Sequence, residues 1–266
     1  RQTRRGRDRR SSDNLDPHHA GCRDRRASWS GSRRTVSTGS SISIRYRLMA
    51  AREEVLGVIL AGGANRRFGS HKALARIGDR TILDRTIDVL KPVVDRIGIV
   101  ANEPEPYLQT GVPVRPDLKP GLGVLGGILT AVRWAAEEAA EAAIVLGCDM
   151  PFLPSPLLSR ISRAATRDLV VLPASDGPRG FEPLCAAYGT AAAEAIEGAL
   201  ERGDRAIVSF FGDVELLILD FDEVRSFGDP DRMFWNVNRP EDRAHAERMA
   251  ASGTGRPDRG SEHEPT

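Results

Sequence analysis

The chain has 266 residues, a formal net charge of +1 and 40% hydrophobic residues, with only 5% aromatic ones. No stretch is long and apolar enough to cross a bilayer, which argues against a membrane-spanning protein, and the length fits one α/β domain with polar ends. Residues 1–52 hold 14 Arg against 4 Asp, which leaves 24 basic and 33 acidic residues in the remainder. That acidic remainder argues against broad nucleic-acid binding.

The two ends of the chain are expected to be disordered. Residues 1–52 are rich in Arg and Ser and lack apolar periodicity. They could be a basic arm for nucleic acid or an organellar transit segment, although the interspersed Asp residues argue against transit. We favour Met49 as the working start, with the preceding residues an artefact of the reading frame. One folded domain then covers 53–250, and residues 251–266 form a disordered tail.

Short aliphatic runs alternate with helical patterns along this domain. Strands are expected over 55–60, 96–100, 112–114, 142–147, 169–172, 184–188 and 214–219, and helices over 82–90, 128–140, 154–165, 191–200 and from 240 onward. This order predicts an α/β fold with a doubly wound, mostly parallel open sheet, Rossmann-like and three-layered, with right-handed crossovers. The cysteines at 22, 148 and 185 lack metal-ligand spacing, and they favour a reducing cytoplasm.

The stretch over residues 55–72, VLGVILAGGANRRFGSHK, carries the clearest signal of a binding site. Its strand breaks at Gly62-Gly63, where a backbone without Cβ atoms can turn sharply and let a ligand approach. Arg66, Arg67 and Lys72 follow, and a glycine-rich turn with nearby cations is a means of holding a polyphosphate. The spacing is not that of G-x-x-x-x-G-K-[ST] or G-x-G-x-x-G. The alternative is an ordinary strand-to-helix turn with solvated arginines.

Polar residues follow the other expected strand ends. In doubly wound sheets ligands bind beyond the carboxyl ends of strands, so Gly62, Asn102, Asp117 and Asp149 are expected around one crevice. Asp149 is a natural Mg²⁺ ligand; the alternative is a cap for the helix that starts near Pro154. Asp117 would bind a base or ribose, or simply form a turn. Asn102 would contact a purine edge with its amide, or tolerate a turn.

Three weaker signals accompany these residues. The glycines over 121–127 satisfy G-x-G-x-x-G, but no strand directly precedes them, so a flexible loop that closes over a bound base fits better than a dinucleotide site. Asn236 and Asn238 alternate and, if extended, share one face that could bind the acceptor's polar ring or help to hold the metal; the alternative is a turn before Pro240. The segment 182–184 is expected on the acceptor side.

The pattern L-A-G-G-x-x-x-R-F-G-x-x-K over residues 60–72 resembles the signature of nucleotidyltransferases, and most closely that of the molybdenum cofactor guanylyltransferase family. Further segments recur in the family's order, so that the resemblance covers about residues 55–248: Asn102, Asp117, the glycines over 121–127, Cys148-Asp149-Met150-Pro151, Glu182-Pro183-Leu184 and Asn236-Val237-Asn238-Arg239-Pro240. The resemblance implies a nucleotidyltransferase domain at 53–250 that transfers GMP from GTP to molybdopterin carrying molybdenum. It also implies Mg²⁺ as cofactor and partners among the proteins that mature molybdoenzymes.

The resemblance assigns roles residue by residue. The guanosine-nucleotide positions are matched by Leu60, Ala61, Gly62, Gly63, Lys72, Asn102, Asp117 and Asp149. Asp149 also matches the magnesium ligand, and Arg67, Lys72 and Asp149 are expected to carry catalysis. Two residues depart from the family's pattern, His71 where Asp is usual and Arg239 where Thr is frequent. His71 puts in doubt an acidic contact beside Lys72.

Four alternatives remain open from the sequence. The protein could be a cytidylyltransferase for the same pterin, or a guanylyltransferase for another phosphorylated small molecule. Gly62-Gly63 favours guanine by resemblance, because the cytidylyl relatives usually carry Ala-Ala-Gly there. A non-catalytic GTP-binding module would not need Asp149 for turnover, and a nucleic-acid-binding protein would act through residues 1–52.

Overall fold

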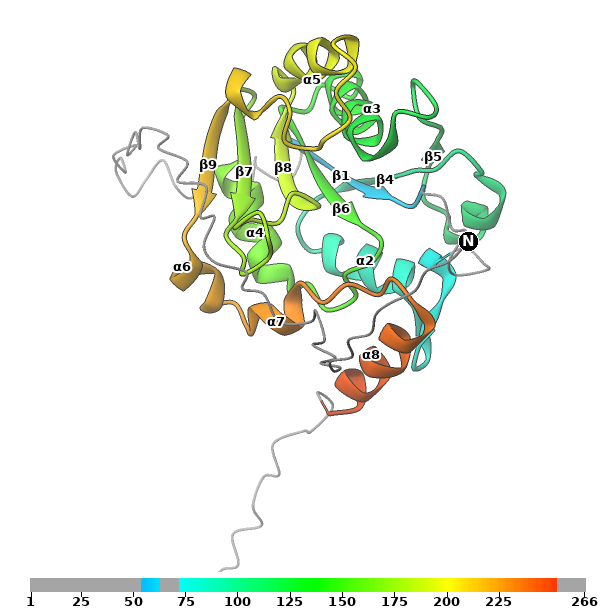
Figure 1. Cartoon of the computed structure of the whole chain (residues 1–266). Coiled ribbons are helices and arrows are strands. Elements are labelled where there is room, and N and C mark those ends of the chain that lie inside the picture. Colours follow the sequence, from blue (N-terminus) through cyan, green and yellow to red (C-terminus); the bar gives the residue numbers. More distant parts are fainter. Residues whose placement is uncertain (1–53, 63–71, 253–266) are drawn as a thin grey trace, which may run out of the picture. The chain divides into compact units, whose positions relative to one another are not determined.

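Seven strands form one sheet in the computed structural model, which describes residues 54–62 and 72–252 (Figure 1). Their bounds are β1 Val55–Leu60, β4 Arg96–Val100, β5 Val114–Arg115, β6 Ala142–Gly147, β7 Leu169–Pro173, β8 Cys185–Gly189 and β9 Glu215–Leu219. The strands lie in the order β5-β4-β1-β6-β8-β7-β9. A separate hairpin pairs β2 (Arg76–Ile77) with β3 (Arg80–Thr81).

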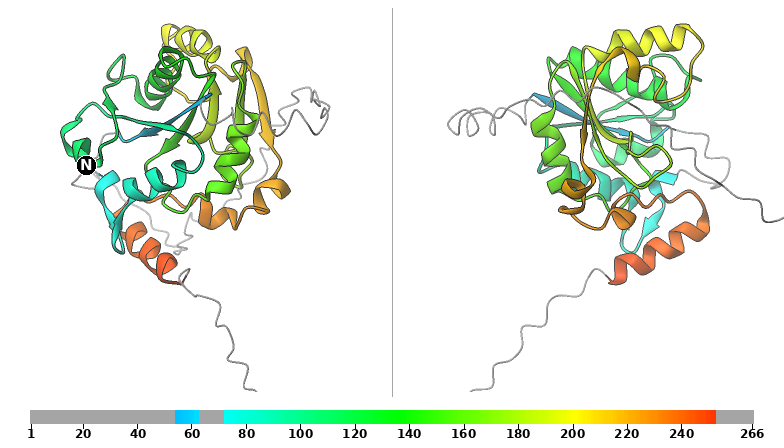
Figure 2. Two further views of the ribbon diagram at one scale, coloured as in Figure 1. Left: turned by 180° about the vertical axis from the view of Figure 1, so that it is seen from behind. Right: turned by 60° about the vertical axis from the view of Figure 1, so that its left-hand side comes forward.

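Helices cover both faces of the seven-stranded sheet. Their bounds are α2 Ile82–Leu90, α3 Gly123–Glu137, α4 Ser155–Ala164, α5 Ala192–Glu201, α6 Phe221–Arg225, α7 Pro230–Met233 and α8 Pro240–Ser252, with short 3-10 helices η2 Lys72–Leu74, η3 Glu105–Thr110 and η4 Phe211–Asp213. Helices α3 and α5 lie over one face and α2 and α4 over the other (Figures 1 and 2). This is the three-layer α/β arrangement that the alternation of elements predicts.

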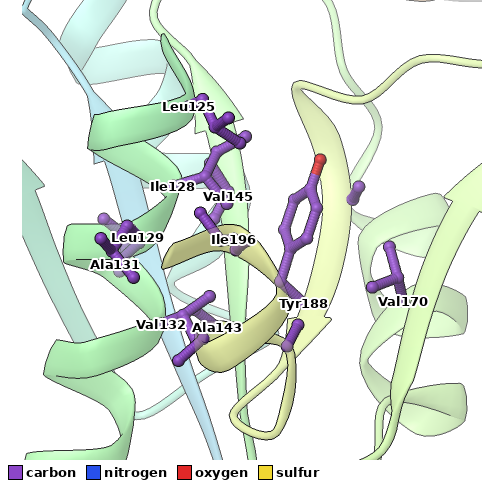
Figure 3. Packing of buried hydrophobic residues seen from close by; sticks show 14 of the residues in the cluster. Leu125, Ile128, Leu129, Ala131, Val132, Ala143, Val145, Val170, Tyr188 and Ile196 are labelled. Carbon is purple, nitrogen blue, oxygen red and sulfur yellow. The ribbon is translucent and has the colours of Figure 1, made fainter. Parts of the chain in front are cut away.

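The core lies on both sides of β1, which explains why the sequence of this strand is a continuous aliphatic run. Leu56 and Val58 belong to the cluster under α3 and α5, which also holds Tyr188, Ile128 of α3 and Ile196 of α5 (Figure 3). Val55 and Ile59 belong to the opposite cluster, under α2 and α4. The alternation places neighbouring residues on opposite faces of the sheet.

Four strands present their carboxyl ends at one edge of the sheet. Strand β1 pairs in parallel with β4 and β6, and β4 pairs in parallel with β5. Strand β8 runs antiparallel to its neighbours β6 and β7, and β9 is parallel to β7. The residues that directly follow the four parallel strands, at 61–62, 101–102, 116–117 and 148–149, are here named the rim.

Helix α2 has the bounds that the sequence predicts. Its first turn is stabilised by a capping box between Thr81 and Asp84. The Thr81 hydroxyl accepts a hydrogen bond from Asp84 N at 3.0 Å, and Thr81 N donates to Asp84 Oδ2 at 3.2 Å. These reciprocal bonds satisfy backbone donors that a helix start otherwise leaves without partners. The strands at 55–60, 96–100 and 142–147 also have their expected bounds.

Helix α3 is where the prediction was wrong. It begins at Gly123 instead of Ile128, so the expected flexible glycine loop over 121–127 is largely the first turn of a helix. Two of these glycines serve close packing: a Cβ added to Gly126 would lie 2.8 Å from Leu122 Cβ, and one added to Gly127 would lie 3.3 Å from Leu60 Cδ1. The hairpin β2–β3 and the short helix η3 had no predicted counterpart.

Within the part of the chain that the structure describes, no helix is both long and apolar enough to cross a membrane. The predicted head at 1–52 lies outside the described residues. So does the predicted tail, apart from its first two positions, which complete α8.

Candidate functional site

Two hydrogen bonds hold Ala61, the residue that follows β1, one to β4 and one to η3. Ala61 N donates to Val100 O at 3.0 Å. Tyr107, on η3, donates its hydroxyl hydrogen to Ala61 O at 3.1 Å. Gly62 follows and is exposed, so the first residue of the predicted turn combines a fixed backbone with access to solvent.

Asn102 and Asp117 form a reciprocal pair at the ends of β4 and β5. Asn102 Nδ2 donates to Asp117 Oδ2 at 2.8 Å, and Asp117 N donates to Asn102 Oδ1 at 2.9 Å. Because the carboxylate only accepts and the backbone N–H only donates, these contacts fix the orientation of the amide. The pair uses one amide N–H and one carboxylate oxygen, so each side chain retains a polar atom with which to contact a ligand.

Lys72 bridges Asp149 and Asn238, which come from distant parts of the sequence. Its Nζ lies 3.2 Å from Asp149 Oδ2 and 2.7 Å from Asn238 Oδ1. The side chains of Lys72 and Asp149 are only 15% and 22% exposed, so this ion pair is partly shielded from water. The contact places a cation, a carboxylate and an amide oxygen together at the end of β6.

The second carboxylate oxygen of Asp149 marks where a metal fits. Asp149 Oδ1 is buried and has no hydrogen-bond partner among residues 54–62 and 72–252. A buried ionised oxygen without a partner is costly, and a cation would satisfy it. The same described residues hold no group of three or more His, Cys, Asp or Glu that could bind a metal. One carboxylate and an amide oxygen suit Mg²⁺, which takes its remaining ligands from phosphate and water.

The segment after α7 reaches this carboxylate through its backbone. Val237 N donates to Asp149 O at 2.9 Å, and the Val237 side chain is fully buried. Asn238 N donates to Asp242 Oδ2 at 2.8 Å, which ties the segment to the first turn of α8. Asn236 instead donates from Nδ2 to Phe234 O at 3.0 Å. Of the two asparagines, Asn238 contacts Lys72, and the side-chain bond of Asn236 stays within its own segment.

Two titratable groups lie beside Asp149 with raised pKa values. Burial raises the pKa of Glu182; the Leu184 N–H opposes that rise, and the charge of Asp149 adds to it. Leu184 O accepts from Gly147 N at 2.9 Å, which attaches the segment 182–184 to the strand that precedes Asp149. Burial also raises the pKa of the Cys148 thiol to about 12, so Cys148 stays protonated and is no candidate nucleophile.

Four predicted residues lie in a part of the chain that the structure does not describe, and one residue of the site was missed. Gly63, Arg66, Arg67 and His71 lie outside the described residues. Tyr107 was not singled out from the sequence, where it is one aromatic residue in a polar, proline-containing segment. The only signal that could have found it is its position shortly after a strand that ends at the expected crevice.

A cavity of about 330 Å³ adjoins the rim on the side of α3. It is lined by Arg115, Pro116, Asp117, Leu118, Thr130, Trp134 and Glu137. The Arg115 guanidinium lies over the Trp134 ring, 4.3 Å from its centroid, and also pairs with Glu137. The cavity shares only Asp117 with the polar groups described above.

Comparison with known proteins gives consistent matches over the folded part of the chain. Residues 57–215 match the MobA-like NTP transferase domain. The molybdenum cofactor guanylyltransferase of Desulfosudis oleivorans is 34% identical over 203 residues, which cover 76% of this chain and 98% of that protein. The molybdenum cofactor guanylyltransferase of Mesorhizobium japonicum is 35% identical over 215 residues, which cover 76% of this chain and 99% of that protein.

A solved structure supports the fold. The crystal structure of molybdopterin-guanine dinucleotide biosynthesis protein A from Archaeoglobus fulgidus has a TM-score of 0.62 at 23% identity, covering 74% of this chain and 99% of that one. The mostly parallel sheet with helices on both faces is thus a nucleotidyltransferase fold, as the sequence predicts.

Proposed function

This chain belongs to the MobA-like NTP transferase family, and we propose that the protein transfers GMP from GTP to molybdopterin carrying molybdenum. The relatives that it matches over nearly their whole length are named molybdenum cofactor guanylyltransferases. The observation that carries the proposal is the contact of Lys72 with Asp149 and Asn238 at the end of β6, the strand that pairs with β1.

We assign the guanosine part of the nucleotide to the rim between β1 and β5. The backbone over 60–62 lies open at Gly62, so a ligand can approach it without meeting a Cβ. Asn102 offers its second amide N–H to an acceptor on the purine, and Asp117 Oδ1 can accept from the base or the ribose. Because Asn102 and Asp117 already hold each other, little side-chain freedom is lost when the nucleotide binds.

We assign the triphosphate and the metal to the end of β6. Asp149 Oδ1 and the amide oxygen of Asn238 would hold Mg²⁺, which when bound supplies charge stabilisation to the phosphate oxygens. Lys72 Nζ lies 3.2 Å from Asp149 Oδ2, and this distance supports our assignment of its ammonium to neutralising phosphate oxygens bound beside that carboxylate. Arg67 is expected to add a second cation from outside the described residues.

The reaction needs positioning more than acid–base chemistry. An oxygen of the acceptor's terminal phosphate forms a bond to the α-phosphorus of GTP, and the bond from that phosphorus to the bridging oxygen of the β-phosphate breaks, which releases pyrophosphate. The attacking phosphate is already an anion near neutral pH, so no general base is required. The side chains at the site hold the two phosphates in line and neutralise charge.

The acceptor is assigned to the side of the segment 182–184, which is attached to β6 through Gly147 and Leu184. The protein would act in the cytoplasm and pass its product to proteins that mature molybdoenzymes. A cytidylyltransferase for the same pterin remains the nearest alternative.

Incubation with each nucleoside triphosphate in turn, Mg²⁺ and molybdopterin carrying molybdenum, followed by detection of pyrophosphate, tests the proposal. We expect release with GTP and little with CTP or ATP. Release with CTP alone would identify the cytidylyl activity. Release with none of them, together with tight GTP binding, would indicate a GTP-binding module.

A further inference from the structure

We propose that Tyr107 is a positioning residue that fixes the Ala61–Gly62 peptide so that the Gly62 N–H faces the nucleotide. The inference rests on the proposed function, because it concerns the same nucleotide site. Tyr107 lies on η3, which follows β4, and its side chain is buried in the cluster under α2 and α4. Its hydroxyl donates to Ala61 O at 3.1 Å.

The hydrogen bond to Ala61 O determines the direction of the Gly62 N–H, because both groups belong to one trans peptide. The C=O and the N–H of one planar peptide point in opposite directions. With the Ala61 carbonyl directed at the Tyr107 hydroxyl, the Gly62 N–H is directed away from Tyr107. Gly62 is exposed, so this N–H is available to a bound ligand.

This peptide needs such a restraint more than its neighbours do. Its flip requires changes only in ψ of Ala61 and φ of Gly62, and glycine adopts either sign of φ with little penalty. The two preceding backbone groups are already held by neighbouring strands, because Ala61 N donates to Val100 O at 3.0 Å and Cys148 N donates to Leu60 O at 3.3 Å. The Tyr107 hydroxyl extends this anchoring by one peptide, to the edge of the predicted turn.

Two hydrogen bonds fix the backbone of Tyr107, so its hydroxyl can hold the Ala61 carbonyl in one orientation. Its backbone N donates to Pro104 O at 2.9 Å, and Thr110 Oγ1 donates to Tyr107 O at 2.7 Å. The hydroxyl stays a donor throughout the neutral range, since burial, with smaller contributions from Cys148 and Glu103, raises the pKa of Tyr107 to about 12.

The chain contains a matched control for the removal of this hydroxyl. Tyr188 is also fully buried and also donates its hydroxyl hydrogen to a backbone carbonyl, Pro183 O at 2.7 Å. Tyr107→Phe and Tyr188→Phe therefore each remove one buried hydroxyl-to-carbonyl bond and keep the ring. Both should lower the melting temperature, so stability alone does not distinguish them.

GTP affinity distinguishes them. We expect Tyr107→Phe to weaken GTP binding by about two- to tenfold, the loss of one net hydrogen bond, and to raise KM for GTP by a similar factor with kcat little changed. Tyr188→Phe should bind GTP like the wild type. Equal affinity of wild type and Tyr107→Phe, or the same loss in both variants, would overturn the proposal.

A measurement without nucleotide separates this inference from the proposed function. The NMR order parameter of the Gly62 N–H, measured in the nucleotide-free protein, should fall from about 0.85, the value of rigid backbone, toward about 0.6 in Tyr107→Phe and remain at the wild-type value in Tyr188→Phe. An unchanged order parameter in Tyr107→Phe would refute the positioning role. A wild type that binds no GTP, with a lowered order parameter in Tyr107→Phe, would refute the proposed function and leave Tyr107 as the anchor of a turn that serves another ligand.

Discussion

Replacing Gly147 with Ala should damage both the fold and the turnover. The added Cβ would lie 2.6 Å from Asp149 Oδ1 and 3.3 Å from Leu184 Cβ. Both neighbours are held in place, because Asp149 Oδ2 lies 3.2 Å from Lys72 Nζ and Leu184 O accepts from the Gly147 N–H at 2.9 Å. Overpacking of this kind costs about 1–3 kcal/mol, which corresponds to a fall in melting temperature of about 2–12 °C for a domain of this size.

The same substitution at Gly62 provides the control. A Cβ at Gly62 would meet nothing in the described residues closer than 3.8 Å, from Ala101 Cα and Val100 O. The Gly62→Ala protein should therefore be as stable as the wild type, or more stable by about 0.4–1 kcal/mol, yet bind GTP more weakly because the methyl group enters the space that the nucleotide approaches.

We would test both predictions on the two variants and the wild type, by thermal melts, GTP binding and pyrophosphate release. We expect Gly147→Ala to lose melting temperature and turnover, and Gly62→Ala to lose GTP affinity alone. A Gly147→Ala protein with the melting temperature and turnover of the wild type would refute the argument that a side chain at position 147 collides with the Asp149 carboxylate.

Three further predictions address charge and specificity. Lys72→Met should lower the rate of pyrophosphate release by about 10²–10³, while Lys91→Met, which removes an exposed lysine paired with Asp88, should leave it unchanged; equal rates for the two would contradict the role of Lys72. Burial raises the pKa of Glu182 above its ordinary value of 4.5. Above pH 4.5 the folded state therefore binds more protons than the unfolded state. Ionisation of Glu182 then lowers the free energy of unfolding as pH rises from 4.5 through the folded pKa. Glu182→Gln should therefore match the wild type in melting temperature near pH 4 and exceed it near pH 7, whereas a difference independent of pH would contradict this reasoning. In competition binding GTP should displace a labelled analogue better than CTP or ATP, and equal or tighter CTP binding would favour the cytidylyl alternative.

The fold could be predicted largely because its central strands are buried on both faces. Strands β1 and β6 have continuous aliphatic sequences with polar or glycine residues at their ends, and helix α2 has a capping box within its own sequence. Local patterns suffice for such elements. The start of α3 was misplaced because glycine disfavours helices, while the close approach of this helix to β1 requires it at Gly127.

The site could be predicted as a set of strand ends, but its pairings could not. Asn102 meets Asp117, and Lys72 meets Asn238, through contacts that only the folded sheet creates. Asn236 and Asn238 are equivalent in sequence pattern, yet Asn238 contacts Lys72 while Asn236 bonds to Phe234 O. Such long-range contacts leave no periodicity in the sequence.

The central claim is that the carboxylate of Asp149 supports metal-dependent nucleotidyl transfer, and Asp149→Asn tests it most directly. Asn has nearly the shape of Asp, so the packing against Gly147 should survive, while the negative charge that Mg²⁺ requires is lost. We would measure Mg²⁺-dependent pyrophosphate release with GTP and molybdopterin carrying molybdenum, beside GTP affinity and a thermal melt. The account predicts a folded Asp149→Asn protein that retains some GTP affinity and has lost turnover, because the loss falls mainly on the transition state. A folded Asp149→Asn protein with near-normal turnover would contradict it.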